Sequence, residues 1–140
     1  MKYTEEELFS LPHTERFRQA VDFSGMVFFK GSTPTDVDGF LEKNNKLFVF
    51  YEYKLRGTPM PEGQEIAYTH LCDALRAAGK QAVLFLCEHK DYDPQINVCG
   101  KDAVVTKYYS NGKWFSGVGK TAKEMTDAYI DWCKGCEAWT

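Results

Sequence analysis

Two carboxylates and one ammonium near the middle of the chain have the residue types of a metal-dependent hydrolytic site: Asp38, Glu52 and Lys54. Mg²⁺ prefers hard oxygen ligands and is usually held by one or two carboxylates, with water and substrate oxygens completing its shell. In phosphodiester cleavage such a cation stabilises charge on the attacking and leaving oxygens. Lys54 follows Glu52 by two residues, so in a strand both side chains share one face, where an ammonium can orient or deprotonate the attacking water. We therefore hypothesise a Mg²⁺ site, in which Mn²⁺ would substitute, with Lys54 acting on the water.

The strand that carries Glu52 and Lys54 is predicted over Leu47–Lys54. Both of its faces are apolar over most of its length, which is typical of a central strand covered on both sides. The two charges then occur together, on one face, at its end. Local departures from the pattern of an element are common at functional sites, so this end of the strand is the candidate site.

The position of Asp38 depends on how this strand connects to the preceding one, which is predicted over Asp36–Lys43. The Asn44-Asn45 pair between them is a hairpin signal. A two-residue turn there would set Asp38 opposite Tyr51, whereas a three-residue loop would set it opposite Glu52. The hypothesis of a shared site therefore requires the longer loop, or a bulge between the two strands.

The rest of the chain alternates between helix and strand signals. Caps, apolar periodicity and turn residues predict helices over 4–7 and 12–21, a strand over 26–31, a helix over 61–78, a strand over 81–87, a hairpin over 103–109 and 113–115, and a helix over 121–133. We expect one α/β domain over residues 1–140. Its mixed central sheet would combine a three-strand meander with a strand–helix–strand crossover and would be flanked by helices.

Composition and charge narrow the function classes. The chain has 140 residues, enough for one domain with a real core, and no apolar run approaches the length of a membrane span. Its N-terminus lacks the layout of a secretory signal, so a cytoplasmic protein is expected. The net charge of −3 argues against binding through a broad basic face, but not against an enzyme that meets phosphates through a cation and a few lysines. The odd number of cysteines, 5, indicates reduced buried thiols rather than a disulfide framework.

Three segments together resemble the PD-(D/E)XK nuclease superfamily, and most closely its small RecB-like or prophage-type nuclease domains: Thr35–Glu42, Phe48–Lys54 and Gly63–Tyr68. The resemblance extends over residues 17–89. It implies a restriction-endonuclease-like core and Mg²⁺-dependent cleavage of DNA, in phage or bacterial DNA processing. The expected location is then the cytoplasm of a bacterium or of a phage-infected cell.

The resemblance also implies roles for individual residues. Asp38 and Glu52 would bind the metal together with the backbone carbonyl of Tyr53. Lys54 would serve the nucleophilic water. Members of the superfamily that keep the fold without cleaving anything are known, so these roles describe an active member.

Further residues would support the site. Gln64 and Tyr68 match in spacing and position a glutamine and a tyrosine that assist catalysis in RecB-like members. The family's proline–aspartate pair is stretched here, so that Asp36 comes first; we prefer Asp38 as the ligand because it is expected mid-strand. A glutamate from the first helix often helps in this superfamily, and Glu15 is the candidate.

Two functions stay open at this point. The first is a nuclease acting on DNA ends, flaps, branches, nicks or single strands, whose substrate path would be lined by basic residues near the site: Lys30, Lys43, Lys46, Arg56 and Lys90. The alternative is a catalytically inactive nuclease-fold protein that binds nucleic acid or another protein. The sequence leaves open whether the substrate is DNA or RNA, whether cleavage is internal or from an end, and whether the protein is a monomer or a homodimer.

Overall fold

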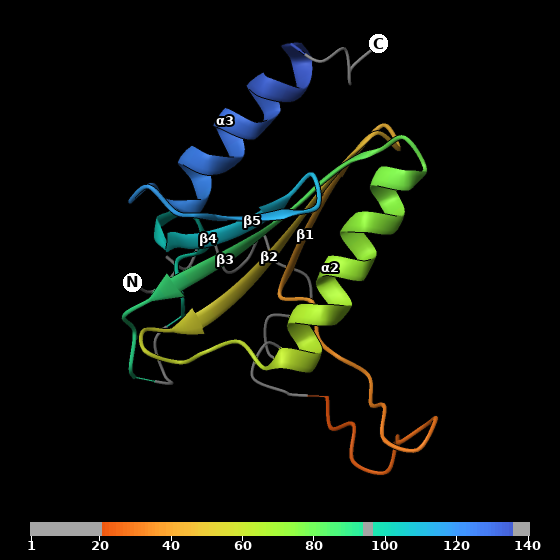
Figure 1. The fold of residues 1–140 in the computed structure, drawn as a ribbon. Coiled ribbons are helices and arrows are strands. Elements are labelled where there is room, and N and C mark those ends of the chain that lie inside the picture. The colour runs from red at the N-terminus through yellow and green to blue at the C-terminus, as the bar shows by residue number, and fades with distance from the viewer. Residues whose placement is uncertain (1–20, 94–96, 136–140) are drawn as a thin grey trace.

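The computed structural model describes residues 21–93 and 97–135 (Figure 1). Its elements, in chain order, are β1 (Gly39–Lys43), β2 (Leu47–Leu55), α2 (Glu62–Ala77), β3 (Gln81–His89), the 3₁₀ turn η2 (Gly100–Asp102), β4 (Val104–Ser110), β5 (Lys113–Ser116) and α3 (Ala122–Gly135). The helices predicted before residue 21, including Glu15, lie outside the described residues. Within the described ranges, no helix has both the length and the apolar character needed to cross a membrane.

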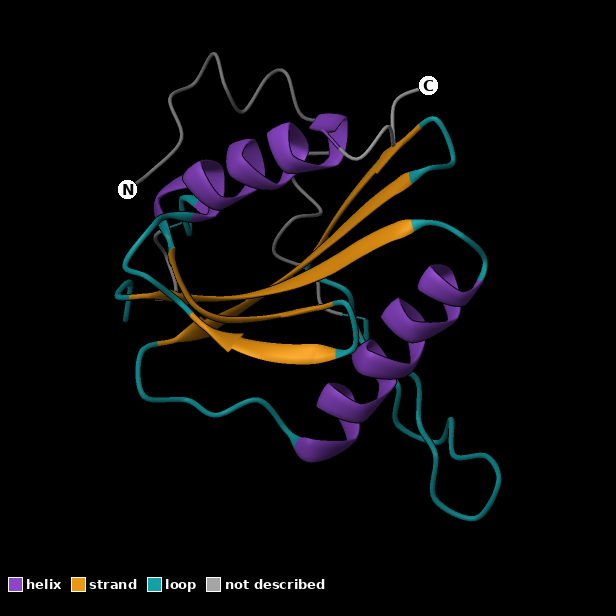
Figure 2. Ribbon diagram, turned by 45° about the horizontal axis from the view of Figure 1, so that its top comes forward, coloured by secondary structure: helices purple, strands orange, loops and turns teal. Residues whose placement is uncertain are grey.

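The five strands form one sheet in the order β1-β2-β3-β4-β5. β2 and β3 are parallel and are connected through α2, whereas the other neighbouring strands of this sheet are antiparallel. Figure 2 shows α2 and α3 on opposite faces of the sheet. A parallel pair requires a long crossover, while a short turn can join an antiparallel pair. The predicted mixed α/β sheet with flanking helices is therefore confirmed.

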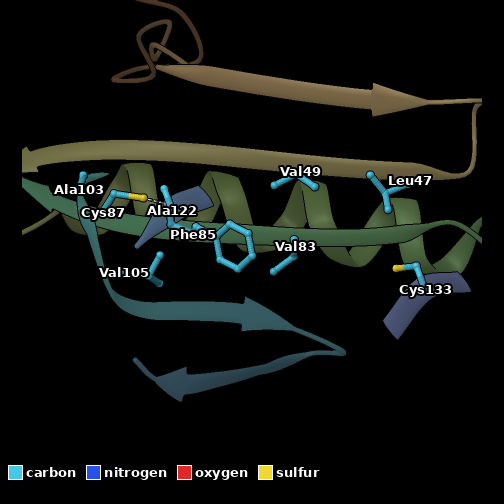
Figure 3. Close-up of a cluster of buried hydrophobic side chains, with 9 residues drawn as sticks. All are labelled: Leu47, Val49, Val83, Phe85, Cys87, Ala103, Val105, Ala122 and Cys133. Carbon is cyan, nitrogen blue, oxygen red and sulfur yellow. Dashed lines mark hydrogen bonds between the residues drawn. The ribbon is translucent and has the colours of Figure 1, made fainter. Parts of the chain in front are cut away.

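β2 is an interior strand that is covered on both faces. On one face Leu47 and Val49 are buried with Phe85 of β3 in a cluster that also includes residues of α3 (Figure 3). On the other face Phe50 packs with Tyr68 of α2. Because both faces carry apolar side chains into a core, the prediction of a central strand covered on both sides is confirmed.

The first predicted strand, over 26–31, is wrong. Phe29 and Lys30 have positive φ angles of 50° and 63°, which belong to the left-handed region and not to a strand. In the turn Phe28–Ser32 the N–H groups of the last two residues both donate to the carbonyl of the first, over 3.1 and 2.7 Å. The chain folds back on itself there, so β1 and β2 form a hairpin rather than the end of a three-strand meander.

α2 ends where its sequence predicts, at a glycine. Gly79 has a left-handed φ of 83°, and its N–H donates to the carbonyl of Arg76 over 2.9 Å. The N–H of Lys80 donates to the carbonyl of Leu75 over 3.0 Å, which completes a Schellman motif. This fixed end orients α2 so that one face, with Tyr68 and Cys72 on it, is buried against the sheet.

The hairpin and capping predictions in the C-terminal half are also confirmed. Asn111 and Gly112 both have positive φ angles, 52° and 75°, as a type I′ turn requires. At the start of α3, the N–H of Thr121 donates to Glu124 Oε1 over 3.0 Å, and the N–H of Glu124 donates to Thr121 Oγ1 over 3.2 Å. This reciprocal pair is a capping box.

The cysteines in the described part of the chain form no disulfide. Cys72, Cys87 and Cys133 are buried, as predicted for reduced thiols. Burial raises the pKa of Cys72 and of Cys87 to about 12, so both are protonated at neutral pH. A protonated buried thiol is neither a nucleophile nor a metal ligand.

Candidate active site

The connection between β1 and β2 is the three-residue loop Asn44–Lys46. Its two asparagines have left-handed φ angles of 51° and 56°, which asparagine tolerates better than most residues. With this loop, the last paired residue of β1 is Gly39, opposite Tyr51. Asp38 is the next residue and Glu52 is its counterpart in the same register. The longer loop that the shared site requires is therefore present.

Asp38 lies directly before β1 and not mid-strand, which corrects its predicted position. Its Oδ2 accepts a hydrogen bond from the backbone N–H of Tyr53 over 2.8 Å. Alternate residues of a strand direct their N–H groups to the same neighbour, so this N–H follows that of Tyr51 along the β1 edge. The Asp38 side chain thus takes the place of a backbone acceptor. That substitution ends the pairing at Gly39 and holds the carboxylate beside β2.

Glu52 is 2% exposed, and three donors surround its carboxylate. Gln64 Nε2 and Lys54 Nζ each lie 3.1 Å from Oε1, and the Tyr68 hydroxyl donates to Oε2 over 2.8 Å. Gln64 and Tyr68 are four residues apart in α2, so both project from the face that meets the sheet. The structure therefore brings these four predicted residues into direct contact.

The surroundings of Glu52 act on its pKa in opposite directions. Burial raises the pKa most, because a poorly solvated site disfavours the charged form, and the nearby carboxylate of Asp38 raises it further. Hydrogen bonds from Tyr68 and Lys54 lower the pKa, but it stays above its ordinary value. Burial and the contact with Glu52 raise the pKa of the Tyr68 hydroxyl well above its usual range, so this group remains a donor.

These side chains line an open cleft of about 780 Å³. One wall is the segment Gly31–Asp36 before β1, and the opposite wall includes the first turn of α2. Between them the cleft reaches Asp38, Glu52 and Lys54. Its volume lies in the range of ligand-binding pockets. The Lys54 side chain is 22% exposed, so its ammonium contacts Glu52 and is also open to the cleft.

Asp36 contributes its backbone to the site. Its carbonyl accepts long hydrogen bonds from Gln64 Nε2, at 3.4 Å, and from the Tyr68 hydroxyl, at 3.3 Å. These contacts tie the cleft wall to α2. The role of Glu15 as a further supporting carboxylate lies outside the described residues.

The basic residues predicted along the substrate path do not all lie near the site. Arg56 and Lys90 follow the ends of the parallel strands β2 and β3, so both are at the edge of the sheet that carries the site. Lys30 is in the turn that precedes the cleft wall. Lys43 and Lys46 lie at the opposite end of the β1–β2 hairpin, with the full length of β1 in between. Proximity in sequence was misleading for these two residues because the hairpin carries them away from the site.

The oxygen donors of the cleft fit a hydrated Mg²⁺ ion. Asp38 and Glu52 supply two carboxylates that raise each other's cost of ionisation, and a divalent cation between them would favour the charged forms. The carbonyl of Tyr53 faces the same edge as its N–H, on the side of Asp38. The described residues contain no group of three or more His, Cys, Asp or Glu side chains suited to a metal. Mg²⁺ does not require one, since it keeps several of its waters.

Lys107, on β4, is a cation near the site that sequence reasoning did not predict. It pairs with Leu86 of β3, and Leu86 pairs with Glu52. A single charge within the largely apolar strand β4 was the available signal. Its place in the sheet depends on an irregular register between β3 and β4, at Leu86 and Cys87, which the sequence does not reveal.

Comparison of the chain with protein-family models, with curated proteins and with solved structures returned no match in any of the three. The resemblance to PD-(D/E)XK nucleases therefore rests on the residues of this chain, and a nuclease-like core stays a prediction.

Proposed function

We propose that this protein is a Mg²⁺-dependent nuclease that hydrolyses phosphodiester bonds of DNA in the cleft of Asp38, Glu52 and Lys54. The observation that carries the proposal is the buried Glu52 carboxylate, which is held by three donors beside a second carboxylate and opens on a cleft. Burying a carboxylate is costly unless it is paired. A purely structural ion pair would require neither the second carboxylate nor the cleft.

Each residue has a role that follows from its contacts. Asp38 and Glu52, with the carbonyl of Tyr53, would hold the cation. Bound there, Mg²⁺ would polarise the phosphoryl oxygen and stabilise charge on the attacking and leaving oxygens. Gln64 and Tyr68 fix the orientation of the Glu52 carboxylate, and the hydrogen bond from Tyr68 also lowers its pKa toward the ionised form that a cation requires.

Lys54 is the residue that acts on the water. Its ammonium lies 3.1 Å from Glu52 Oε1 and faces the cleft, so it is next to the oxygens that would bind the cation. From there it orients the attacking water by a hydrogen bond and stabilises negative charge that develops on the phosphoryl group. Its removal is expected to lower the rate at least about a hundredfold.

Cleavage of labelled single-stranded, duplex and branched DNA in Mg²⁺ or Mn²⁺ tests the proposal. We expect the wild type to cut at least one of these substrates and to stop when the metal is chelated, and we expect Asp38→Ala and Lys54→Ala to be inactive. Asp127→Ala and Lys113→Ala are the matched controls. Both remove the same charges from exposed positions, on α3 and at the far end of β5, and both should cleave like the wild type.

The assay also decides the alternative. If the folded wild type cuts none of these substrates in either metal but still binds DNA or a protein, catalysis is excluded and the chain is a binding module. RNA strands of the same sequences, run in parallel, separate a DNA from an RNA preference.

A further inference from the structure

A second, smaller cleft adjoins the candidate active site on the α2 face of the sheet. Its volume is about 220 Å³, and its lining includes Thr58, Glu65, Leu86, Glu88 and Lys107. Lys54 lines both clefts. Because one ammonium borders both, a chain molecule that lies in the larger cleft can continue past Lys54 into the smaller one.

Sheet register places Lys107 in this second cleft. Glu52 pairs with Leu86 in the parallel ladder of β2 and β3, and Leu86 pairs with Lys107 in the antiparallel ladder of β3 and β4. Paired residues of neighbouring strands project from the same face, so Glu52 and Lys107 share a face at a separation of two strand spacings, roughly 10 Å. Leu86 lies between them as an apolar surface.

The contacts of Lys107 hold its ammonium in place without neutralising it firmly. Its Nζ lies 3.5 Å from Glu65 Oε2 and 4.3 Å from the centroid of the Trp114 ring. The side chains of Lys107 and Glu65 are 37% and 32% exposed, and an ion pair so open to water contributes little. Glu88, the other carboxylate of this cleft, lies 3.8 Å from the guanidinium of Arg56. The Glu65 carboxylate can therefore give way to another anion at Lys107.

We propose that Lys107, together with Lys54, binds a second phosphate of the nucleic-acid backbone, next to the phosphate that is cleaved. This inference rests on the proposed function and adds that the substrate is a polynucleotide with at least two neighbouring phosphates. Lys107 acts as a positioning residue, because its contact fixes how the strand lies across Lys54. Glu65 competes with the phosphate for the same ammonium, so removing the Glu65 charge has the opposite effect to removing the Lys107 charge.

The opposite signs are tested by binding of a fluorescent single-stranded DNA, followed by anisotropy in chelator. All variants carry Asp38→Ala, so that no cleavage occurs. We expect Lys107→Gln to weaken binding about tenfold and to reduce the slope of log affinity against log salt by about one. Glu65→Gln should tighten binding about threefold. Lys113→Gln is the matched control at the far end of the sheet and should stay within about twofold of its parent.

A small substrate separates this inference from the proposed function. Bis(p-nitrophenyl) phosphate has one phosphate, so Lys107→Gln in the otherwise wild-type chain should hydrolyse it with unchanged kcat/KM, while its KM for an oligonucleotide rises about tenfold. If Lys107→Gln binds DNA as tightly as Lys113→Gln, or if Glu65→Gln weakens binding together with a lower melting temperature, the subsite is wrong and the pair is structural. Failure of the wild type to hydrolyse the small ester in Mn²⁺ contradicts the proposed function instead, and the anisotropy result still decides the subsite.

Discussion

The carboxylate of Asp38 accepts a hydrogen bond from the backbone N–H of Tyr53, with 2.8 Å between Oδ2 and N. This contact joins the residue before β1 to the C-terminal part of β2, next to Glu52. An otherwise exposed carboxylate is thereby held in one orientation by a strand rather than by a loop. Sites built on regular elements are more precisely positioned than sites on loops. The pair of carboxylates therefore meets the geometric requirement of a preorganised cation site.

Replacing Tyr68 by phenylalanine tests how the Glu52 carboxylate is kept ionised. The Tyr68 hydroxyl donates to Glu52 Oε2 and lowers the pKa of Glu52. Without this donor the pKa rises, so the acidic limb of the pH–rate profile should move to higher pH. The loss of a buried hydrogen bond to a charged group should also lower the free energy of unfolding by about 1–3 kcal/mol. A profile whose acidic limb stays in place would show that Glu52 does not control the activity.

Replacing Glu52 by glutamine tests the electrostatic cost of the site. The folded-state pKa of Glu52 is raised above its ordinary value of 4.5, so the folded state holds the proton more tightly than the unfolded chain. This contribution to stability is fully present below pH 4.5 and is lost as the pH rises through the folded pKa. In metal-free buffer, the wild type should therefore lose stability relative to Glu52→Gln over that window. Urea unfolding of both proteins across pH measures the difference in unfolding free energy, and a difference that stays constant with pH would contradict a raised pKa of Glu52.

Removing the cap of α3 should separate stability from function. Thr121→Ala deletes one half of the capping box, and the loss of such a cap costs about 1 kcal/mol of unfolding free energy. The pKa of Glu124, held low by its hydrogen bonds from Thr121, should rise. Because α3 covers the sheet face opposite α2, cleavage below the melting temperature should be unchanged. A cleavage rate that falls with the Thr121→Ala substitution would place α3 in the functional machinery.

Local sequence was sufficient for the elements that present the site. The alternation along β2 placed Glu52 and Lys54 on one face, and helical spacing placed Gln64 beside Tyr68 on α2. The hairpin signal at Asn44-Asn45 reduced the register to two choices, one of which is observed. The choice between them depends on how the third loop residue closes the turn, which a turn signal alone does not specify.

Other features depend on contacts between residues distant in sequence. Asp38 was expected mid-strand because its neighbours favour a strand, but its bond to Tyr53 ends β1 at Gly39. The aromatic run before it has the composition of a strand, yet its backbone turns at Phe29 and Lys30. Propensity is a weak guide where tertiary contacts or left-handed backbone decide the outcome. For the same reason, the position of a single lysine on β4 could not be derived without the register of the sheet.

Binding of Mn²⁺ to the metal-free protein, measured by calorimetry, tests the central claim most directly because it requires no knowledge of the substrate. We expect saturable binding by the wild type whose affinity increases with pH, since the cation and the proton compete for the Glu52 carboxylate. Asp38→Asn keeps an oxygen acceptor for the Tyr53 N–H but removes the charge, so it should fold normally and bind at least about tenfold more weakly. Absence of saturable binding by the wild type, or equal affinity in Asp38→Asn, would contradict a cation site at Asp38 and Glu52.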